Sequence, residues 1–220
     1  MPVESLAKRK ERTAEITKIL KKAYPDPRIA LNFSNPLELL IATILSAQCT
    51  DKRVNMVTEH LFKKYRSAAD YAAADPKVFE NEIKSTGFYH NKTKSVLGAA
   101  NRIARDYRGN VPDNMADLLT LPGVARKTAN VVLGGAFRKN EGIVVDTHVI
   151  RLSQRIKLTA HKDNSGNKIE QDLIALVPRQ DWTEFGNRLI LHGRTICTAR
   201  HPDCGGCVLQ KNCPSAFQLR

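Results

Sequence analysis

Apolar residues recur at helical spacing through most of the chain, and the clearest case lies at residues 126–138. Every third or fourth residue there is apolar, which places these side chains on one stripe of an amphipathic helix. The stripe consists of Ala129, Val132, Leu133, Ala136 and Phe137. Lys127 falls on the opposite face of the same helix. The pattern therefore predicts a helix that buries one side and directs Lys127 away from it.

Similar patterns predict helices along the rest of the chain. Residues 37–48 are almost wholly apolar and follow an N-cap asparagine and a first-turn proline, so this helix is expected to be buried. The pair Asp75-Pro76 opens a helix that ends before Gly87. Because no stretch sustains the alternation of a strand, the predicted class is all-α. The remaining predicted helices span residues 4–23, 52–65, 92–107, 147–156, 168–176 and 181–198, with a short one from Asp113.

The composition is strongly basic. Lysine and arginine number 35 against 22 aspartates and glutamates, which gives a formal charge of +13 and an isoelectric point near 9.7. Such a balance suits a polyanionic partner, and it equally suits a ribosomal or membrane-surface protein. No apolar run approaches the ~20 residues that cross a membrane, and the charged N-terminus lacks the apolar core of a signal peptide. We therefore expect a soluble, cytoplasmic protein with no membrane partner.

The segment before the amphipathic helix predicts an anion site. Residues 121–125 (LPGVA) contain Pro122 and Gly123, which favour a tight turn between two helical patterns. A tight turn followed at once by a helix N-terminus leaves backbone N–H groups without partners inside the helix, and such groups bind phosphate. An ordinary corner between two helices is the alternative interpretation of this segment alone.

A carboxylate stands at the start of another predicted helix. Asp146 follows a short apolar run, residues 143–145, at the position of an N-cap for the helix over residues 147–156. Lys127 lies in the first turn of its own helix. An amine and a carboxylate beside a phosphate-binding turn suit chemistry on a nucleotide. Without such chemistry, the same two residues are a surface lysine and an ordinary helix cap.

Four of the five cysteines crowd the C-terminal end of the chain. They are Cys197, Cys204, Cys207 and Cys213, separated by six, two and five residues. In an intracellular chain this clustering favours a metal site over disulfides. Four close thiolates fit either tetrahedral zinc or a [4Fe–4S] cube, and general spacing rules leave both open. Cys49 has no cysteine neighbour in the sequence and is expected to be a small packing residue.

Two runs of sequence, LPGVARKTANVV and VVDTHVIRL, resemble the helix-hairpin-helix and Gly/Pro–Asp signature of the endonuclease III family of DNA glycosylases. The resemblance extends from about residue 32 to residue 214, and it implies that Lys127 and Asp146 are catalytic. Ala125 departs from the family pattern, because the hairpin usually has a second glycine there; alanine is small enough to keep close backbone approach. The cysteine spacing also matches the family's cluster, which implies one [4Fe–4S] cluster on residues 197–213.

The resemblance also implies residues that contact DNA. The run LSAQCTD matches the family's loop whose glutamine, here Gln48, fills the gap left by an extruded base. Taken by itself, Gln48 is a polar helix terminus. Phe88 opens a run of aromatic, asparagine and lysine residues, and it takes the position of an apolar wedge acting opposite the glutamine, with core packing as the competing interpretation. Further DNA contacts are implied for Leu121, Gly123, Val124, Ala125, Arg126 and His148.

By this resemblance the chain forms two helical lobes with the active site in the cleft between them. Residues 29–139 would form a central domain, and residues 1–28 with 140–220 a second domain that carries the cluster loop. The implied activity is base-excision repair: removal of oxidised pyrimidines from duplex DNA, then cleavage of the abasic strand by β-elimination through a lysine Schiff base. The expected partner is double-stranded DNA with a damaged pyrimidine or an abasic site, bound by a monomer in the nucleoid of a prokaryotic cytoplasm.

Two other functions stay open on the sequence alone. A monofunctional adenine or mismatch DNA glycosylase would share the scaffold and the cluster. Such relatives generally lack an amine at the position of Lys127 and activate water instead. A non-catalytic iron–sulfur protein that binds DNA or senses redox state would use only the hairpin and the cluster.

Overall fold

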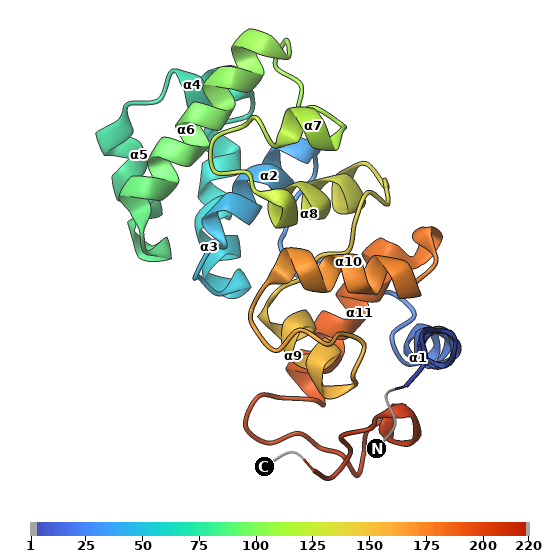
Figure 1. The fold of residues 1–220 in the computed structure, drawn as a ribbon. Coiled ribbons are helices and arrows are strands. Elements are labelled where there is room, and N and C mark those ends of the chain that lie inside the picture. Colours follow the sequence, from blue (N-terminus) through green and yellow to red (C-terminus); the bar gives the residue numbers. More distant parts are fainter. Residues whose placement is uncertain (1–3, 219–220) are drawn as a thin grey trace. The chain divides into compact units, whose positions relative to one another are not determined.

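The computed structural model describes residues 4–218, and every regular element in that range is a helix (Figure 1). No strand occurs among these residues, so the prediction of an all-α protein is confirmed. None of the described helices combines the length and the apolar character that a membrane crossing requires. The elements in chain order are α1 Leu6–Ala23, α2 Pro36–Leu45, α3 Asp51–Lys64, α4 Ala68–Ala72, α5 Pro76–Ile83, η1 Lys84–Thr86, α6 Tyr89–Asp106, α7 Met115–Leu118, α8 Arg126–Ala136, α9 Thr147–Arg155, α10 Gly166–Leu176, η2 Arg179–Asp181, α11 Trp182–Thr195 and η3 Gln210–Asn212.

Contacts divide the chain into two compact units. The central unit, Ile29–Lys139, contains helices α2 to α8. The terminal unit combines the described residues before Ile29 with those from Asn140 onward, and it contains α1 and α9 to α11. Each unit has a hydrophobic core of its own, so each is a packed structure in its own right.

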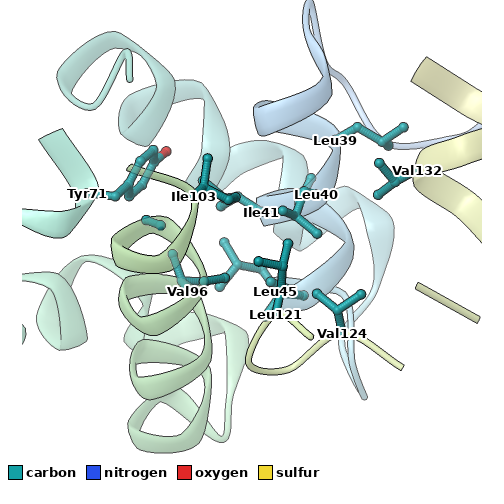
Figure 2. Packing of buried hydrophobic residues seen from close by; sticks show 14 of the residues in the cluster. Leu39, Leu40, Ile41, Leu45, Tyr71, Val96, Ile103, Leu121, Val124 and Val132 are labelled. Atoms are coloured by element: carbon teal, nitrogen blue, oxygen red, sulfur yellow. The ribbon is translucent and has the colours of Figure 1, made fainter. Parts of the chain in front are cut away.

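Helix α2 lies at the centre of the core of the central unit. All its residues from Leu39 to Leu45 are buried, and it packs against α3, α6 and α8. Figure 2 shows Leu39 beside Val132 of α8, and Leu45 beside Leu121 and Val124 from the segment between α7 and α8. A helix that is apolar on every side is stable only when other elements cover it. The segment between α7 and α8 is therefore seated directly on the core.

The terminal unit is built from both ends of the chain. Helix α9 packs against α11, and α1 packs against α10 and α11. Burying one large aliphatic side chain contributes about 1.5–3 kcal/mol, so α1 stabilises the C-terminal helices through its own buried residues. The fully buried aliphatic residues of this core include Ile16, Leu20, Leu152, Leu173 and Leu189.

Helix α2 ends three residues earlier than its apolar pattern predicts. It stops at Leu45, and the Ser46 hydroxyl donates a hydrogen bond of 2.8 Å to the Thr43 carbonyl. The Cys49 amide then donates to the Ser46 carbonyl at 3.1 Å. These bonds close a turn in place of further helix. Gln48 therefore lies within this turn, and its interpretation as a helix terminus is wrong.

Two other differences concern short-range signals. Helix α6 begins at Tyr89 instead of residue 92, because Phe88 serves as its N-cap and its carbonyl accepts a hydrogen bond of 3.1 Å from the Lys92 amide. The sequence patterns also predict no helix at α4, which has only five residues. Ser67 and Asp70 form a capping box there, and this pair was the available signal.

Candidate functional site

The turn between α7 and α8 is a hairpin closed by its own backbone. The Val124 amide donates to the Leu121 carbonyl at 3.1 Å, and Gly123 takes a left-handed φ of 76°. The side chains of Leu121 and Val124 are buried, with 2% and 7% of their surface exposed. These two residues can therefore meet a ligand only through their backbone. Pro122, Gly123 and Ala125 are exposed.

Helix α6 supports the hairpin at three points. A Cβ atom added at Gly123 would lie 2.5 Å from Ser95 Cβ, so glycine alone permits this approach. A Cβ atom added at Gly98, almost one turn further along α6, would lie 3.2 Å from the ring of Pro122. Arg102 Nη1 donates a hydrogen bond of 2.9 Å to the carbonyl that precedes the turn. The position of the hairpin is therefore set by one face of α6.

Helix α8 begins directly after the hairpin. Its N-cap, Ala125, has an extended backbone (φ −95°, ψ 171°) and, among the described residues, no side-chain hydrogen bond caps this end. The amides of the first turn then have no partner inside the helix, and they carry the positive end of the helix dipole. Lys127 is exposed in this first turn, and Arg126 beside it is half-buried. The arrangement favours an anion next to the Lys127 amine.

Two of the predicted DNA-contact residues in the central unit are exposed and have a left-handed backbone, as Arg108 and Arg138 of the same unit also do. Gln48 has φ 52° in the turn after α2, and Phe88 has φ 48° and ψ 29° as the N-cap of α6. Such a conformation costs a non-glycine residue on the order of 1–3 kcal/mol and is retained where the surroundings enforce it. The Phe88 side chain is 62% exposed, so its interpretation as a core residue is wrong. Both side chains are held out toward solvent.

In the terminal unit, Asp146 caps helix α9. Its Oδ1 atom accepts hydrogen bonds from the amides of His148 at 2.8 Å and Val149 at 2.9 Å. The residues before it, 143–145, are buried, and Asp146 itself is half-buried. The predicted N-cap is confirmed, and the two amide bonds fix the direction of the carboxylate.

His148 connects this cap to the cysteine loop. Its Nδ1 atom lies 3.2 Å from Arg151 Nη2, which also donates to the carbonyls of Gly193 at 2.8 Å and Cys197 at 3.1 Å. Burial lowers the pKa of His148; the positive charge of Arg151 adds to this effect, and Asp146 opposes it. A guanidinium can only donate, so the Nδ1 atom of His148 accepts the hydrogen bond from Arg151.

The four C-terminal cysteines line one pocket of the terminal unit, together with apolar side chains from α9 and from the loop itself. None of the four forms a disulfide. Nitrogen atoms of two side chains meet two of the sulfurs: Arg155 Nη1 lies 3.3 Å from Cys197 Sγ, and His192 Nε2 lies 3.4 Å from Cys207 Sγ. The loop thus directs its thiols toward one space and surrounds them with donors.

The arrangement of the described side chains around this pocket does not suit a single metal ion. Burial raises the pKa of the Cys207 and Cys213 thiols, so a cationic metal is needed to hold them as thiolates. Within residues 4–218, no three cysteine, histidine or acidic side chains are arranged to hold one metal ion. An iron–sulfur cluster binds its ligands at separate corners, and four thiols facing one pocket fit such a group.

The predicted site residues divide between the two units. Those in the central unit are Gln48, Phe88, hairpin residues 121–126 and Lys127. Those in the terminal unit are Asp146, His148, Cys197, Cys204, Cys207 and Cys213. Sequence reasoning missed Ser95 and Arg151, which support the hairpin and the cysteine loop. Their partners are distant in the sequence, so no short-range pattern marks these two residues.

Comparison with known families gives two matches. Residues 41–179 match the HhH-GPD superfamily of base excision DNA repair proteins. Residues 197–213 match the iron-sulfur binding domain of endonuclease III. The first match includes Lys127 and Asp146, and the second spans the four clustered cysteines.

Individual relatives extend the likeness over nearly the whole chain. Endonuclease III from Synechocystis sp. is 51% identical over 214 residues, which are 97% of this chain and 97% of that protein. A solved structure of a non-covalent endonuclease III–DNA complex aligns with a TM-score of 0.89 and 39% identity, covering 95% of this chain and 97% of that one. A trapped covalent endonuclease III–DNA intermediate aligns with the same values.

Gly123→Ala should destabilise the protein more than Gly109→Ala does. Both glycines have positive φ, 76° and 81°, so alanine carries a similar left-handed penalty of about 1–2 kcal/mol at each position. A Cβ at Gly109 meets no atom within 4 Å, whereas a Cβ at Gly123 would lie 2.5 Å from Ser95. This crowding should add about 1–3 kcal/mol, measured as the difference in free energy of unfolding in urea. Equal losses would mean that Ser95 does not hold the hairpin.

Proposed function

The chain belongs to the endonuclease III family of base-excision DNA repair proteins, and on this premise we propose that Lys127 and Asp146 are its catalytic residues. The activity of the chain is that of a DNA glycosylase and abasic-site lyase. The observation that carries the residue assignment is the place of Lys127. It is exposed in the first turn of α8, which follows the hairpin directly and has no side-chain cap at its N-terminus among the described residues. An amine there can reach the sugar of a nucleotide whose phosphate the same turn binds.

The substrate in this proposal is duplex DNA with an oxidised pyrimidine or an abasic site. The formal charge of +13 favours binding to phosphates, and the solved structures similar to the chain include a complex of endonuclease III with DNA. The chain would act as a monomer, because one chain supplies every residue assigned to the site.

The hairpin would have one role in DNA binding, and Gln48 and Phe88 would have another. The backbone amides of Gly123 and Ala125 would hold a phosphate without reading the base sequence. Gln48 and Phe88 are exposed, and they would enter the base stack when the damaged nucleotide leaves it. A glycosylase needs this extrusion because C1′ of a stacked nucleotide is inaccessible to a protein nucleophile.

Lys127 would carry the covalent chemistry. Its neutral amine attacks C1′, the new N–C1′ bond forms, and the base departs with the electron pair of the glycosidic bond and gains a proton. Loss of a further amine proton and opening of the sugar ring give an imine. Removal of a proton from C2′ then expels the 3′ phosphate by β-elimination. Water finally hydrolyses the imine and releases Lys127.

Asp146 would stabilise the positive charge that develops on the sugar as the base leaves. Its carboxylate would also help to move the amine proton of Lys127. Two amide hydrogen bonds to Oδ1 support this role, because they hold the carboxylate in a fixed direction before substrate arrives. Such preorganisation avoids the cost of turning the group during the reaction.

The chain binds an iron–sulfur cluster through residues 197–213, and the cluster we propose is one [4Fe–4S] cube held by the four cysteines. Zinc with Zn–S bonds of about 2.3 Å would bring the sulfurs to about 3.8 Å from one another. The described cysteines are not arranged to hold a single ion. When bound, the cube cross-links a loop that is too short to form a core.

The presence of Lys127 favours this activity over its rivals. A monofunctional adenine or mismatch glycosylase activates water and needs no amine at this position. A DNA-binding or redox-sensing protein without catalysis would need neither an exposed lysine beside the hairpin nor a carboxylate fixed at the N-terminus of α9. The likeness to a trapped covalent complex is a further reason to prefer the bifunctional enzyme.

Lys127→Gln should abolish strand cleavage and covalent trapping together, while binding to lesion DNA stays nearly normal. Borohydride added during turnover should reduce the imine of the unmodified enzyme and leave DNA attached to the peptide that contains Lys127. Lys77→Gln removes an exposed lysine of the same unit and should trap normally. Undiminished trapping in Lys127→Gln would mean that another amine is the nucleophile.

Asp146→Asn should slow base release by about a hundredfold, because a neutral amide stabilises positive charge less well than a carboxylate. Stability should change little, since asparagine caps a helix as well as aspartate does. Asp75→Asn is the matched control, because Asp75 Oδ1 caps α5 through two amide bonds of 2.8 and 3.0 Å. Single-turnover excision and urea unfolding measure the two effects. If both variants excised at the normal rate, Asp146 would be only a cap.

Protein purified without oxygen should contain about four irons per chain and absorb broadly near ~400 nm. Cys204→Ser should lower iron content and soluble yield more than it lowers the excision rate of the protein that remains folded, because the loop serves stability. Metal analysis and absorbance spectra provide the measurement. One zinc per chain in place of iron would contradict the cluster assignment.

A further inference from the structure

Lys92 is a buried cation outside the proposed catalytic chemistry. Only 4% of its surface is exposed, although it lies in the first part of α6 beside the exposed Phe88. Its Nζ atom donates a hydrogen bond of 2.7 Å to the Thr86 carbonyl. The sequence places this lysine among residues that could touch nucleic acid, but its side chain points into the protein. Burying an ammonium group is costly unless its donors are satisfied, so its position needs a reason.

The buried ammonium group lies where two exposed loops meet. Thr86, which accepts its hydrogen bond, stands two residues before Phe88. Burial lowers the pKa of Lys92, and the Cys49 sulfur, next in the chain to Gln48, opposes that shift. Helix α3, which follows the Gln48 turn, packs against η1, which precedes Phe88. Lys92 is therefore close to the segment that carries Gln48 and to the segment that carries Phe88.

Helix α6 relates this cation to the hairpin. Lys92 is one turn before Ser95, the residue that contacts Gly123. With a rise of 1.5 Å per residue, Phe88 and Ser95 are about 10 Å apart along the helix axis. A single rigid element thus carries an exposed aromatic residue at its N-terminus and supports the hairpin further along. The start of this element has no side-chain cap among the described residues, so another contact must fix the Phe88 backbone.

We propose that Lys92 is a positioning residue for base extrusion: its bond to Thr86 holds the Phe88 loop, next to the Gln48 turn, at a fixed distance from the hairpin. This inference rests on the proposed function, because it gives Phe88 its role as a wedge. Lys92 touches neither the base nor the sugar in this scheme. It determines how well the wedge is placed when the nucleotide leaves the stack.

The experiment compares Lys92→Met with Lys94→Met. Both variants lose one positive charge from α6, but Lys94 is exposed. Lys92→Met should release a paired, oxidised base about tenfold to a hundredfold more slowly, the range expected for a small displacement of a positioning group. Cleavage at a preformed abasic site, which has no base to extrude, should keep its normal rate. Lys94→Met should be normal on both substrates. Circular dichroism at the assay temperature confirms that each variant is folded.

A second comparison uses the Phe88→Ala background. If Lys92 acts through Phe88, then Lys92→Met should add little to the slow excision of Phe88→Ala, because coupled residues are not additive. Additive losses, or an equal loss on the abasic substrate, would show a merely structural role and overturn the inference. A normal excision rate in Lys92→Met would overturn it as well.

The same series separates this inference from the proposed function. Normal excision by Phe88→Ala would remove the wedge assignment, and the inference would fall with it. A slow Phe88→Ala with a normal Lys92→Met would leave the wedge in place and overturn only the role of Lys92. Absence of both excision and abasic cleavage in the unmodified protein would refute the proposed function itself.

Discussion

The contact between Gly123 and Ser95 is the constraint on which the proposed DNA-binding surface of the central unit depends. A side chain at Gly123 would collide with α6, so the hairpin can sit close to that helix only with glycine in the turn. The buried side chains of Leu121 and Val124 hold the same turn from the core side. The exposed amides and the first turn of α8 are therefore rigidly placed before any ligand arrives, and a preorganised site loses less entropy on binding.

In the terminal unit, helix α9 takes part in two features at once. The carboxylate of Asp146 caps the N-terminus of α9, and its Oδ1 atom accepts both amide hydrogen bonds. Along the same helix, Arg151 and Arg155 donate hydrogen bonds to carbonyls in and beside the cysteine loop. That loop has few apolar residues of its own, so its conformation depends on these bonds and on a bound metal group. A charge proposed for catalysis and the support of the cluster loop are thus carried by one short helix.

The sequence predicts those features that depend on neighbours along the chain. The stripe of α8, the turn at Pro122 and Gly123 and the cap at Asp146 all follow from spacing and local chemistry. The end of α2 does not, because nothing in the composition of residues 46–49 rules out further helix. The hydrogen bonds of the Ser46 hydroxyl and the Cys49 amide close the turn instead. The left-handed backbone of Phe88 is likewise absent from the local pattern, because non-glycine residues seldom adopt it.

The burial of Lys92 is only partly predictable from the sequence. Positions 92, 96, 99 and 103 fall on one face of α6, and the last three are Val96, Ala99 and Ile103. A lysine that continues an apolar stripe is therefore visible in the sequence, although its partner is not. Exposed lysines outnumber buried ones, so composition alone assigns such a residue to the surface. The helical period instead predicts that Lys92 is buried. The structure shows it buried, because the Thr86 carbonyl offers the ammonium group an acceptor inside the protein. A charged residue within a helical apolar stripe thus indicates a specific buried contact, and here that contact fixes the loop that presents an exposed aromatic side chain.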